Sequence, residues 1–406
     1  MKAAFLFSAF TVLLLSACAT PTVLLDEDGA AVLDRALTDA LADSNIPGMV
    51  ALVTSRDSVL YRRAFGVTGV ASTKPMTTDG IFRIHSMTKA ITSLALMILV
   101  ERGEVDLDAP ASRYLADLKD REVLVSVDTA ADRASTRPAS REITVRDLLR
   151  HTSGFAYTFS NHELLLMDEN GGTGGRAQPI LHDPGERWTY GVGTAFVGWI
   201  VEEVSQQALP DFLRAEIFEP LGMNETSFDL APSKMGRLVD LVRRVDGVVT
   251  SSPRPDSYES QGRGDGGLVS TADDYARFIQ LILGRGGRGS ERLLSEASVA
   301  EMSRNQLEGI TVVEQPSALP NLARAFPTNA GKDGFSLAFQ VSTEDAANRR
   351  EPGSLSWAGL GNAHFWIDPK SKIGVVLLFQ IFPFYDEEVL KVMDRFERVL
   401  YGEALN

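Results

Sequence analysis

Cysteine is almost absent from this chain of 406 residues, which contains Cys18 and no other. A single cysteine forms no disulfide within the chain, and its place near the start leaves no thiol nucleophile in the body of the protein. The histidines show no metal-ligand spacing, and no His-Glu-x-x-His motif occurs; they are His85, His151, His162, His182 and His364. We therefore expect no metal and no cofactor.

Positive charge is also scarce. Lys and Arg number 40 against 54 Asp and Glu, which gives a formal net charge of −14 at pH 7. A surface with this excess of negative charge repels the phosphates of nucleic acids and of anionic lipids. We therefore expect no nucleic-acid partner. At 44% hydrophobic and 23% charged residues, the chain can still bury a sizeable core.

The N-terminal segment has the features of a targeting signal. Met1-Lys2 supplies a minimal positive charge, and residues 3–15 form an apolar run too short to span a bilayer comfortably. The run ends in Leu15-Ser16-Ala17-Cys18, which resembles a bacterial lipobox, where the chain is cut before the cysteine and its thiol is lipidated. We predict a lipoprotein signal peptide over residues 1–18 and a tether over 19–28.

The expected destination is the cell envelope. Ala19 does not resemble the Asp of an inner-membrane retention signal, so we expect a lipid anchor on Cys18 at the periplasmic side of the outer membrane. An ordinary secretory leader and an N-terminal hydrophobic anchor remain as alternatives.

Apolar periodicity outlines the fold. Helical spacing predicts a helix over 29–44, and β-rich runs follow at 49–54 and 58–65. From about residue 105 to 271, short helices alternate with loops rich in Gly and Pro. Strand-like runs return at the end, before a helix over 387–401; they cover 335–341, 354–357, 364–367 and 373–380. One sheet built from both chain ends is the economical arrangement.

This pattern predicts two domains. We assign residues 29–104 and 290–406 to an α/β domain and residues 105–289 to an inserted, mainly helical domain. A cleft is expected between them, with Ser86 at the junction.

The candidate catalytic stretch is Ile84-His85-Ser86-Met87-Thr88-Lys89-Ala90, followed by a mostly apolar run over 91–100. It predicts a strand end, a turn and a buried helix with Ser86 in its first turn. Residues three apart share a helix face, so Lys89 would lie beside the Ser86 hydroxyl. A desolvated lysine can have its pKa lowered far enough to take a proton from serine. Ser-x-x-Lys also occurs often by chance, so the motif needs support from its context.

Five segments together resemble the serine hydrolases of the β-lactamase/penicillin-binding-protein superfamily, above all class C β-lactamases and family VIII carboxylesterases. They follow the family order over most of residues 30–380. They are Ser86-Met87-Thr88-Lys89, Asp147-Leu148-Leu149-Arg150-His151-Thr152-Ser153-Gly154, Pro184-Gly185-Glu186-Arg187-Trp188-Thr189-Tyr190, Pro220-Leu221-Gly222-Met223 and Gly266-Gly267-Leu268-Val269-Ser270-Thr271. The resemblance implies a β-lactamase-like fold of the α/β (α+β) type, with an antiparallel sheet flanked by helices and an inserted helical domain.

The resemblance also implies roles for single residues. Ser86 matches the nucleophile, Lys89 its partner, and Tyr190 the tyrosine of the family's Tyr-x-Asn element. The phenol of Tyr190 could relay a proton beside a cationic Lys89, or it could be a core aromatic. The backbone N–H groups of Ser86 and Leu360 match the donors to the oxyanion, and Gly359 suits a close backbone approach.

Two departures from the β-lactamase pattern bear on the substrate. Val192 stands where β-lactamases have an asparagine, and Trp357-Ala358-Gly359 stands where they have Lys-Thr-Gly. Both changes remove polar groups that would hold the amide and the carboxylate of a lactam, so a carboxylate would be desolvated there without compensation. An uncharged ester avoids this cost. Trp357 could also be a sheet residue packed in the core.

We therefore predict a serine carboxylesterase that hydrolyses small uncharged esters through an acyl-enzyme on Ser86. One alternative is a D,D-peptidase or weak β-lactamase, which fits the envelope but not Trp357 and Val192. Another is a non-enzymatic envelope-binding lipoprotein. No Gly-x-Ser-x-Gly motif occurs, which argues against an α/β-hydrolase. The sequence leaves open whether Lys89 or Tyr190 is the general base.

Overall fold

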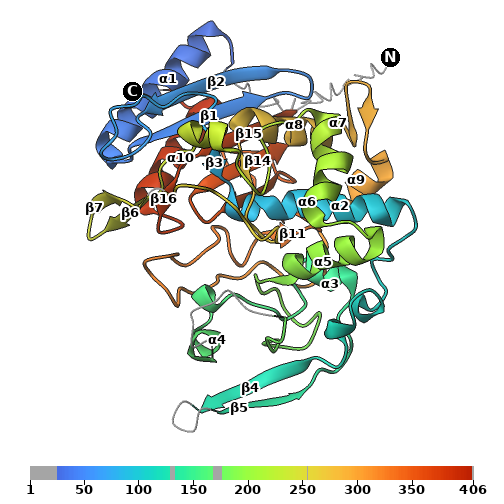
Figure 1. Cartoon of the computed structure of the whole chain (residues 1–406). Helices are drawn as coiled ribbons and strands as arrows, with labels where there is room; N and C mark the ends of the chain where they lie inside the picture. Colours follow the sequence, from blue (N-terminus) through green and yellow to red (C-terminus); the bar gives the residue numbers. More distant parts are fainter. Residues whose placement is uncertain (1–24, 129–132, 168–175, 254, 405–406) are drawn as a thin grey trace, which may run out of the picture.

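The computed structural model describes residues 25–128, 133–167, 176–253 and 255–404 (Figure 1). The predicted signal peptide, Cys18 and most of the tether lie outside these residues and stay predictions. No helix in the described part of the chain is long and apolar enough to cross a membrane.

The central sheet has seven strands in the order β11-β12-β13-β14-β15-β1-β2, and every neighbouring pair is antiparallel. Its strands come from both ends of the chain, as predicted, and β1 lies beside β15 with Leu52 opposite Val376. The strands are β1 (Gly48–Thr54), β2 (Val59–Gly66), β11 (Gly334–Phe335), β12 (Gln340–Val341), β13 (Leu355–Gly359), β14 (Ala363–Asp368) and β15 (Ile373–Leu378).

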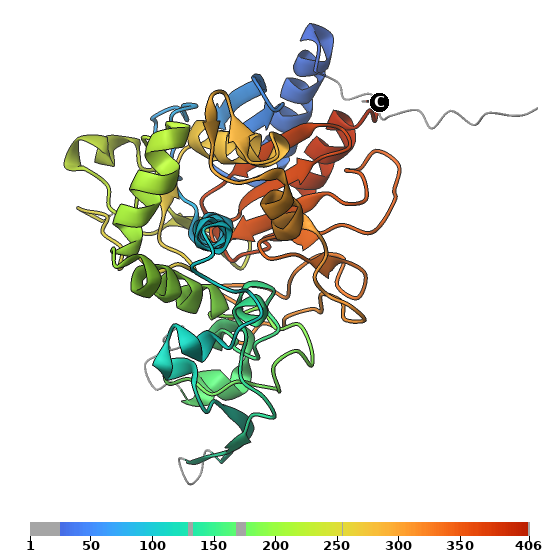
Figure 2. The ribbon, with the colours of Figure 1, turned by 90° about the vertical axis from the view of Figure 1, so that its right-hand side faces the viewer.

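Helices cover both faces of this sheet. On one face α1 (Glu27–Ser44) and α10 (Glu387–Leu400) pack against alternate residues of β1, such as Val53. The residues between them, such as Leu52, face the larger core with α2 (Thr88–Glu101) and α8 (Ala272–Leu283). Because side chains alternate across a strand, β1 is buried along its whole length. Figure 2 looks nearly along α2, drawn in cyan, between the sheet and the green helices.

Residues 105–289 include the teal and green segment that lies below α2 in Figure 1. They also include α8, which packs on the sheet. Helix α5 packs against α2, whereas α8 packs against β1 and β15. The remaining helices between residues 145 and 303 are α3 (Val145–Leu149), α4 (His162–Met167), α5 (Gly193–Ser205), α6 (Leu209–Leu213), a π-helical turn (Arg214–Phe218), α7 (Glu219–Leu221) and α9 (Glu296–Ser303).

Several short strands were not predicted. The hairpin of β4 and β5 projects from the molecule in Figure 1, and β6 and β7 form a small sheet with β16. The sequences of β5 and β6 lack the apolar alternation that marks a half-buried strand, whereas β4 has alternating valines at 123, 125 and 127 that were overlooked. The strands are β3 (Phe82–Arg83), β4 (Glu122–Asp128), β5 (Arg133–Pro138), β6 (Val242–Val245), β7 (Val248–Ser251), β8 (Val269–Ser270), β9 (Gly287–Arg288), β10 (Glu291–Arg292) and β16 (Ile381–Phe382).

The single strand predicted over residues 335–341 is wrong. The segment is a hairpin in which β11 and β12 pair through Phe335 and Gln340. Ser336 makes the turn, because its hydroxyl accepts hydrogen bonds from the N–H groups of Ala338 and Phe339 at 3.1 and 2.9 Å. A serine whose side chain satisfies nearby backbone donors favours a turn over a continuous strand.

Candidate active site

Ser86 lies in a 3₁₀ turn (His85–Met87) that leads directly into α2. Residues 268–270 hold this turn in place. Strand β3 pairs with β8, and the Ile84 N–H donates to the Leu268 carbonyl at 3.0 Å. This pairing brings the Gly266-Gly267-Leu268 segment against the Ser86 turn. The half-buried Ser86 therefore stands at the N-terminal end of a fully packed helix.

Lys89 is buried one turn further along and points back at the serine. Its Nζ lies 3.2 Å from Ser86 Oγ, 2.8 Å from the Tyr157 hydroxyl and 2.7 Å from the Asp265 carbonyl oxygen. Burial lowers the pKa of Lys89 to about 7, against an opposing effect of the nearby Asp265 charge. A fraction of the lysine is therefore neutral near pH 7 and able to accept the Ser86 proton.

Tyr157 and Asp265 belong to this cluster, and the sequence interpretation missed both. The Tyr157 hydroxyl donates to Asp265 Oδ2 at 2.6 Å, and Arg263 donates to both carboxylate oxygens at 3.0 Å. Burial alone would raise the pKa of Asp265, but Lys89 and Arg263 hold it below its usual value, so the residue stays ionised. The position of Asp265 directly before the Gly266-Gly267 motif could have indicated its place in the site. No sequence feature indicated Tyr157.

Tyr190 faces the same cluster from the segment before α5. Its ring centroid lies 4.9 Å from Lys89 Nζ, and its hydroxyl interacts with Ser86 and accepts a hydrogen bond from Trp357 Nε1 at 3.4 Å. Burial raises the pKa of Tyr190 above its usual value despite these two hydrogen bonds. The residue is therefore a neutral phenol, suited to donating a proton or hydrogen bond rather than to removing one.

The end of β13 packs tightly on the Ser86 turn. A Cβ built on Gly359 would lie 2.2 Å from the Ile84 carbonyl oxygen, so only glycine permits this approach. Leu360, predicted to donate to the oxyanion, follows directly and packs partly buried against the main core. The predicted role of the Leu360 and Ser86 N–H groups as oxyanion donors stays a prediction. The end of β13 packs on the Ser86 turn and so brings the two backbone segments close together.

The other predicted site residues lie around this centre. Trp357 is 8% exposed and packs with its ring centroid 4.9 Å from that of Tyr190. Val192 caps the start of α5 and is 1% exposed, in the main core. His151, which was not predicted as a site residue, is also buried beside Tyr190, with ring centroids 4.8 Å apart. In the described part of the chain, no group of three or more His, Cys, Asp or Glu side chains could hold a metal.

Comparison with known proteins gives the family. The model of the family described as Beta-lactamase matches residues 33–397. Monacolin J acid methylbutanoyltransferase of Aspergillus terreus is 30% identical over 93% of this chain and 96% of its own length. Esterase EstB of Burkholderia gladioli is 27% identical over 86% and 90%.

A solved structure shows the same relationship. Unliganded simvastatin synthase from Aspergillus terreus superposes with a TM-score of 0.79 at 28% identity, covering 93% of this chain and 99% of that one. The fold, the family model and the relatives agree on the family. The chain belongs to the beta-lactamase family of serine hydrolases and acyltransferases.

Proposed function

We propose that the protein is a serine carboxylesterase that forms an acyl-enzyme on Ser86 with small uncharged esters. The observation that carries this proposal is the buried Lys89 Nζ at 3.2 Å from Ser86 Oγ, with a pKa lowered to about 7. A nucleophile and a base within hydrogen-bond reach, with the base oriented by further groups, form the arrangement needed for acyl transfer.

In the proposed mechanism neutral Lys89 accepts the proton of Ser86 as its Oγ attacks the ester carbonyl carbon. The tetrahedral oxyanion is stabilised by the backbone N–H groups of Ser86 and Leu360. The carbonyl–oxygen bond to the alcohol then breaks, and the Tyr190 hydroxyl gives its proton to the departing alkoxide. The Lys89 ammonium then returns a proton to the Tyr190 phenolate, which leaves both groups neutral again. Water repeats the sequence on the acyl-Ser86 ester, which releases the carboxylic acid and restores Ser86.

The surroundings of the nucleophile favour an uncharged substrate. The indole N–H of Trp357 donates to the Tyr190 hydroxyl, and Val192 is buried in the core. Neither side chain can pair with a carboxylate, so an anionic lactam would lose hydration without gaining a partner. This supports an ester over a lactam or a D-alanyl peptide.

Acyl transfer to an alcohol is a second candidate. The relatives include a methylbutanoyltransferase that aligns over nearly the whole chain. The chemistry differs only in the molecule that attacks the acyl-Ser86 ester, since an alcohol in place of water yields a new ester. The same nucleophile, base and oxyanion donors serve both reactions.

The experiment uses a soluble chain that starts after Cys18. Turnover of p-nitrophenyl acetate, butyrate and octanoate is measured beside nitrocefin, with and without added alcohols as acceptors. We expect Ser86→Ala to abolish ester turnover, while Ser93→Ala, a buried serine of the same helix, keeps it. Dominant nitrocefin turnover, or unchanged ester turnover in Ser86→Ala, would contradict the proposal.

A further inference from the structure

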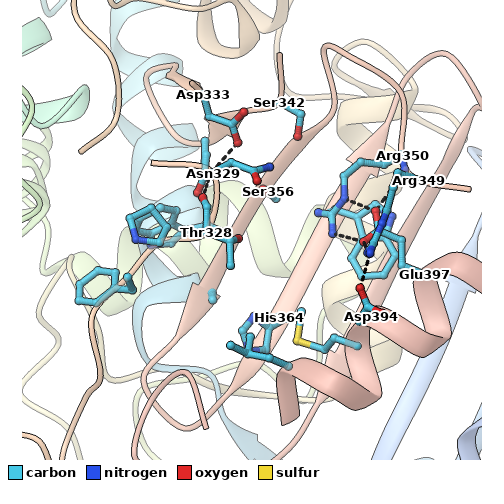
Figure 3. A pocket seen from close by; sticks show the side chains of 18 of the residues that line it. Thr328, Asn329, Asp333, Ser342, Arg349, Arg350, Ser356, His364, Asp394 and Glu397 are labelled. Carbon is cyan, nitrogen blue, oxygen red and sulfur yellow. Dashed lines mark hydrogen bonds and ion pairs between the residues drawn. The ribbon is translucent and has the colours of Figure 1, made fainter. Parts of the chain in front are cut away.

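A cavity of about 490 Å³ lies on the face of the sheet that α10 covers (Figure 3). Its lining comes from β13 and β14 on one side, with Ser356, His364 and Trp366, and from α10, with Met393 and Glu397. Cavities of this volume are typical of small-molecule sites. None of the residues of the Ser86 cluster except Trp357 lines it.

The cavity adjoins the catalytic centre through one layer of aromatic side chains. Phe326 lines the cavity and also packs edge-on against Tyr190, with ring centroids 5.6 Å apart. Trp357 lines it too while its Nε1 reaches the Tyr190 hydroxyl. A molecule in the cavity would therefore contact Phe326 and Trp357, which pack on Tyr190, without contacting Ser86.

His364 provides an unused polar group on the cavity lining. It is 5% exposed, and its Nε2 is buried without a hydrogen-bond partner among the described residues. Burial, helped by the charge of Arg350, lowers its pKa to about 3, so the imidazole is neutral at pH 7. A buried polar atom without a partner is rare in a native fold and needs an explanation, such as a ligand that completes it.

The charges of the cavity argue against an anionic ligand. Its two guanidinium groups are already engaged, because Arg350 donates to both oxygens of Glu397 at 2.7 and 3.1 Å and Arg349 donates to Glu397 at 3.1 Å and also to Asp394. Four carboxylates line the cavity against these two cations, and one of them, Glu344, pairs with Lys332 next to the cavity; the four are those of Asp333, Glu344, Asp394 and Glu397. The excess of negative charge disfavours a further carboxylate or phosphate.

The remaining lining alternates apolar ring faces with hydroxyl groups. Phe384 and Tyr385 lie side by side with centroids 4.5 Å apart, and the ring of Phe384 is nearly parallel to that of His364. Ser342 and Ser356 add hydroxyls that can donate or accept. A pyranose ring has the complementary surface, with C–H groups on its faces and hydroxyls around its edge.

We propose that this cavity is a binding site for a neutral, hydroxyl-rich ring of the size of a mono- or disaccharide, with one hydroxyl donating to His364. The site does not depend on the esterase activity and is tested without it. Trp357 and Trp366 line the cavity among four tryptophans in the chain, so occupancy is expected to change the tryptophan fluorescence.

The probes are methyl β-D-glucopyranoside, cellobiose and N,N′-diacetylchitobiose, titrated into the chain lacking its signal peptide and followed by fluorescence and calorimetry. We expect at least one of them to bind, and glucuronate, the same ring with a carboxylate, to bind about tenfold more weakly or not at all. No binding of any neutral probe up to roughly 10 mM, or tighter binding of glucuronate, would overturn the proposal.

Two variants and one control test whether the ligand binds in this cavity. His364→Leu keeps the volume but removes the nitrogen, and is expected to weaken binding about tenfold, the effect of one lost hydrogen bond to a ligand. Ala346→Trp places a large side chain at the exposed rim and should abolish binding, whereas Ala347→Trp, one residue along and outside the lining, should not. Because both alanines are exposed, each tryptophan variant should fold. Equal binding by the Ala346→Trp and Ala347→Trp proteins would overturn the assignment.

Discussion

Replacing Asp265 with asparagine tests the electrostatics that make Lys89 a base. The carboxylate is linked to Lys89 Nζ through the Tyr157 hydroxyl by hydrogen bonds of 2.6 and 2.8 Å. At a separation of about 5 Å and an effective dielectric constant of about 20, two unit charges interact by about 3 kcal/mol. This attraction stabilises the ammonium form, and Asp265→Asn removes it while an amide oxygen can still accept from Tyr157.

The expected result is a shift of the acidic limb of the pH profile to lower pH. With the carboxylate gone and Arg263 still present, the Lys89 ammonium loses its proton more readily. About 3 kcal/mol corresponds to roughly 2 pH units, and screening and reorientation reduce this to about 1–2 units. The limb of kcat/KM, expected near pH 7 in the parent protein, should then lie near pH 5 to 6, so that the variant keeps more of its plateau rate in acid.

The assay is kcat/KM for p-nitrophenyl butyrate over roughly pH 4 to 11, read at a wavelength where the nitrophenol and its anion absorb equally. Asp211→Asn, a half-exposed carboxylate on α6, is the control and should leave the limb in place. Circular dichroism and thermal unfolding establish that Asp265→Asn is folded. A limb that stays at its parent position, or moves to higher pH, would refute Lys89 as the titrating base; a parent limb well above pH 9 would point to Tyr190.

Three further predictions follow from the same geometry. Gly359→Ala brings a Cβ to 2.2 Å from the Ile84 carbonyl oxygen, so we expect kcat to fall at least about tenfold, with thermal unfolding showing how much of the loss is global. Trp357→Lys should leave cephalosporin turnover poor, because Val192 still supplies no amide; efficient nitrocefin hydrolysis by this variant would contradict the pocket argument. Lys89→Met should stabilise the fold by a few kcal/mol at pH 6 and by much less at pH 10. The reason is that a lysine with a depressed pKa in the folded state destabilises the fold increasingly as the pH falls from 10.5 to about 7; urea unfolding at both pH values measures the difference.

Local sequence determined the parts of this protein that depend on neighbours in the chain. The spacing of Ser86 and Lys89 places both on one helix face whatever surrounds them. Apolar periodicity located α1 and α10, since each must bury one face, and continuous β-rich runs located the long strands β1, β14 and β15, which are buried on both faces. The ordered motifs gave the β-lactamase family, which the family model and the relatives confirm.

Only the tertiary structure decided which distant residues complete the site. Asp265 and Tyr157 are 176 and 68 residues from Lys89 in sequence. Asp265 meets it because β8 pairs with β3, and Tyr157 meets it because tertiary packing brings its loop to the start of α2. The split of residues 335–341 into two strands depends on the hydrogen bond that the Ser336 hydroxyl accepts from the Ala338 N–H, and the pattern of apolar residues does not predict this bond. The cavity at His364 arises where β14 and α10 meet the loop segments around Phe326 and Ala346, a space that none of these elements specifies alone.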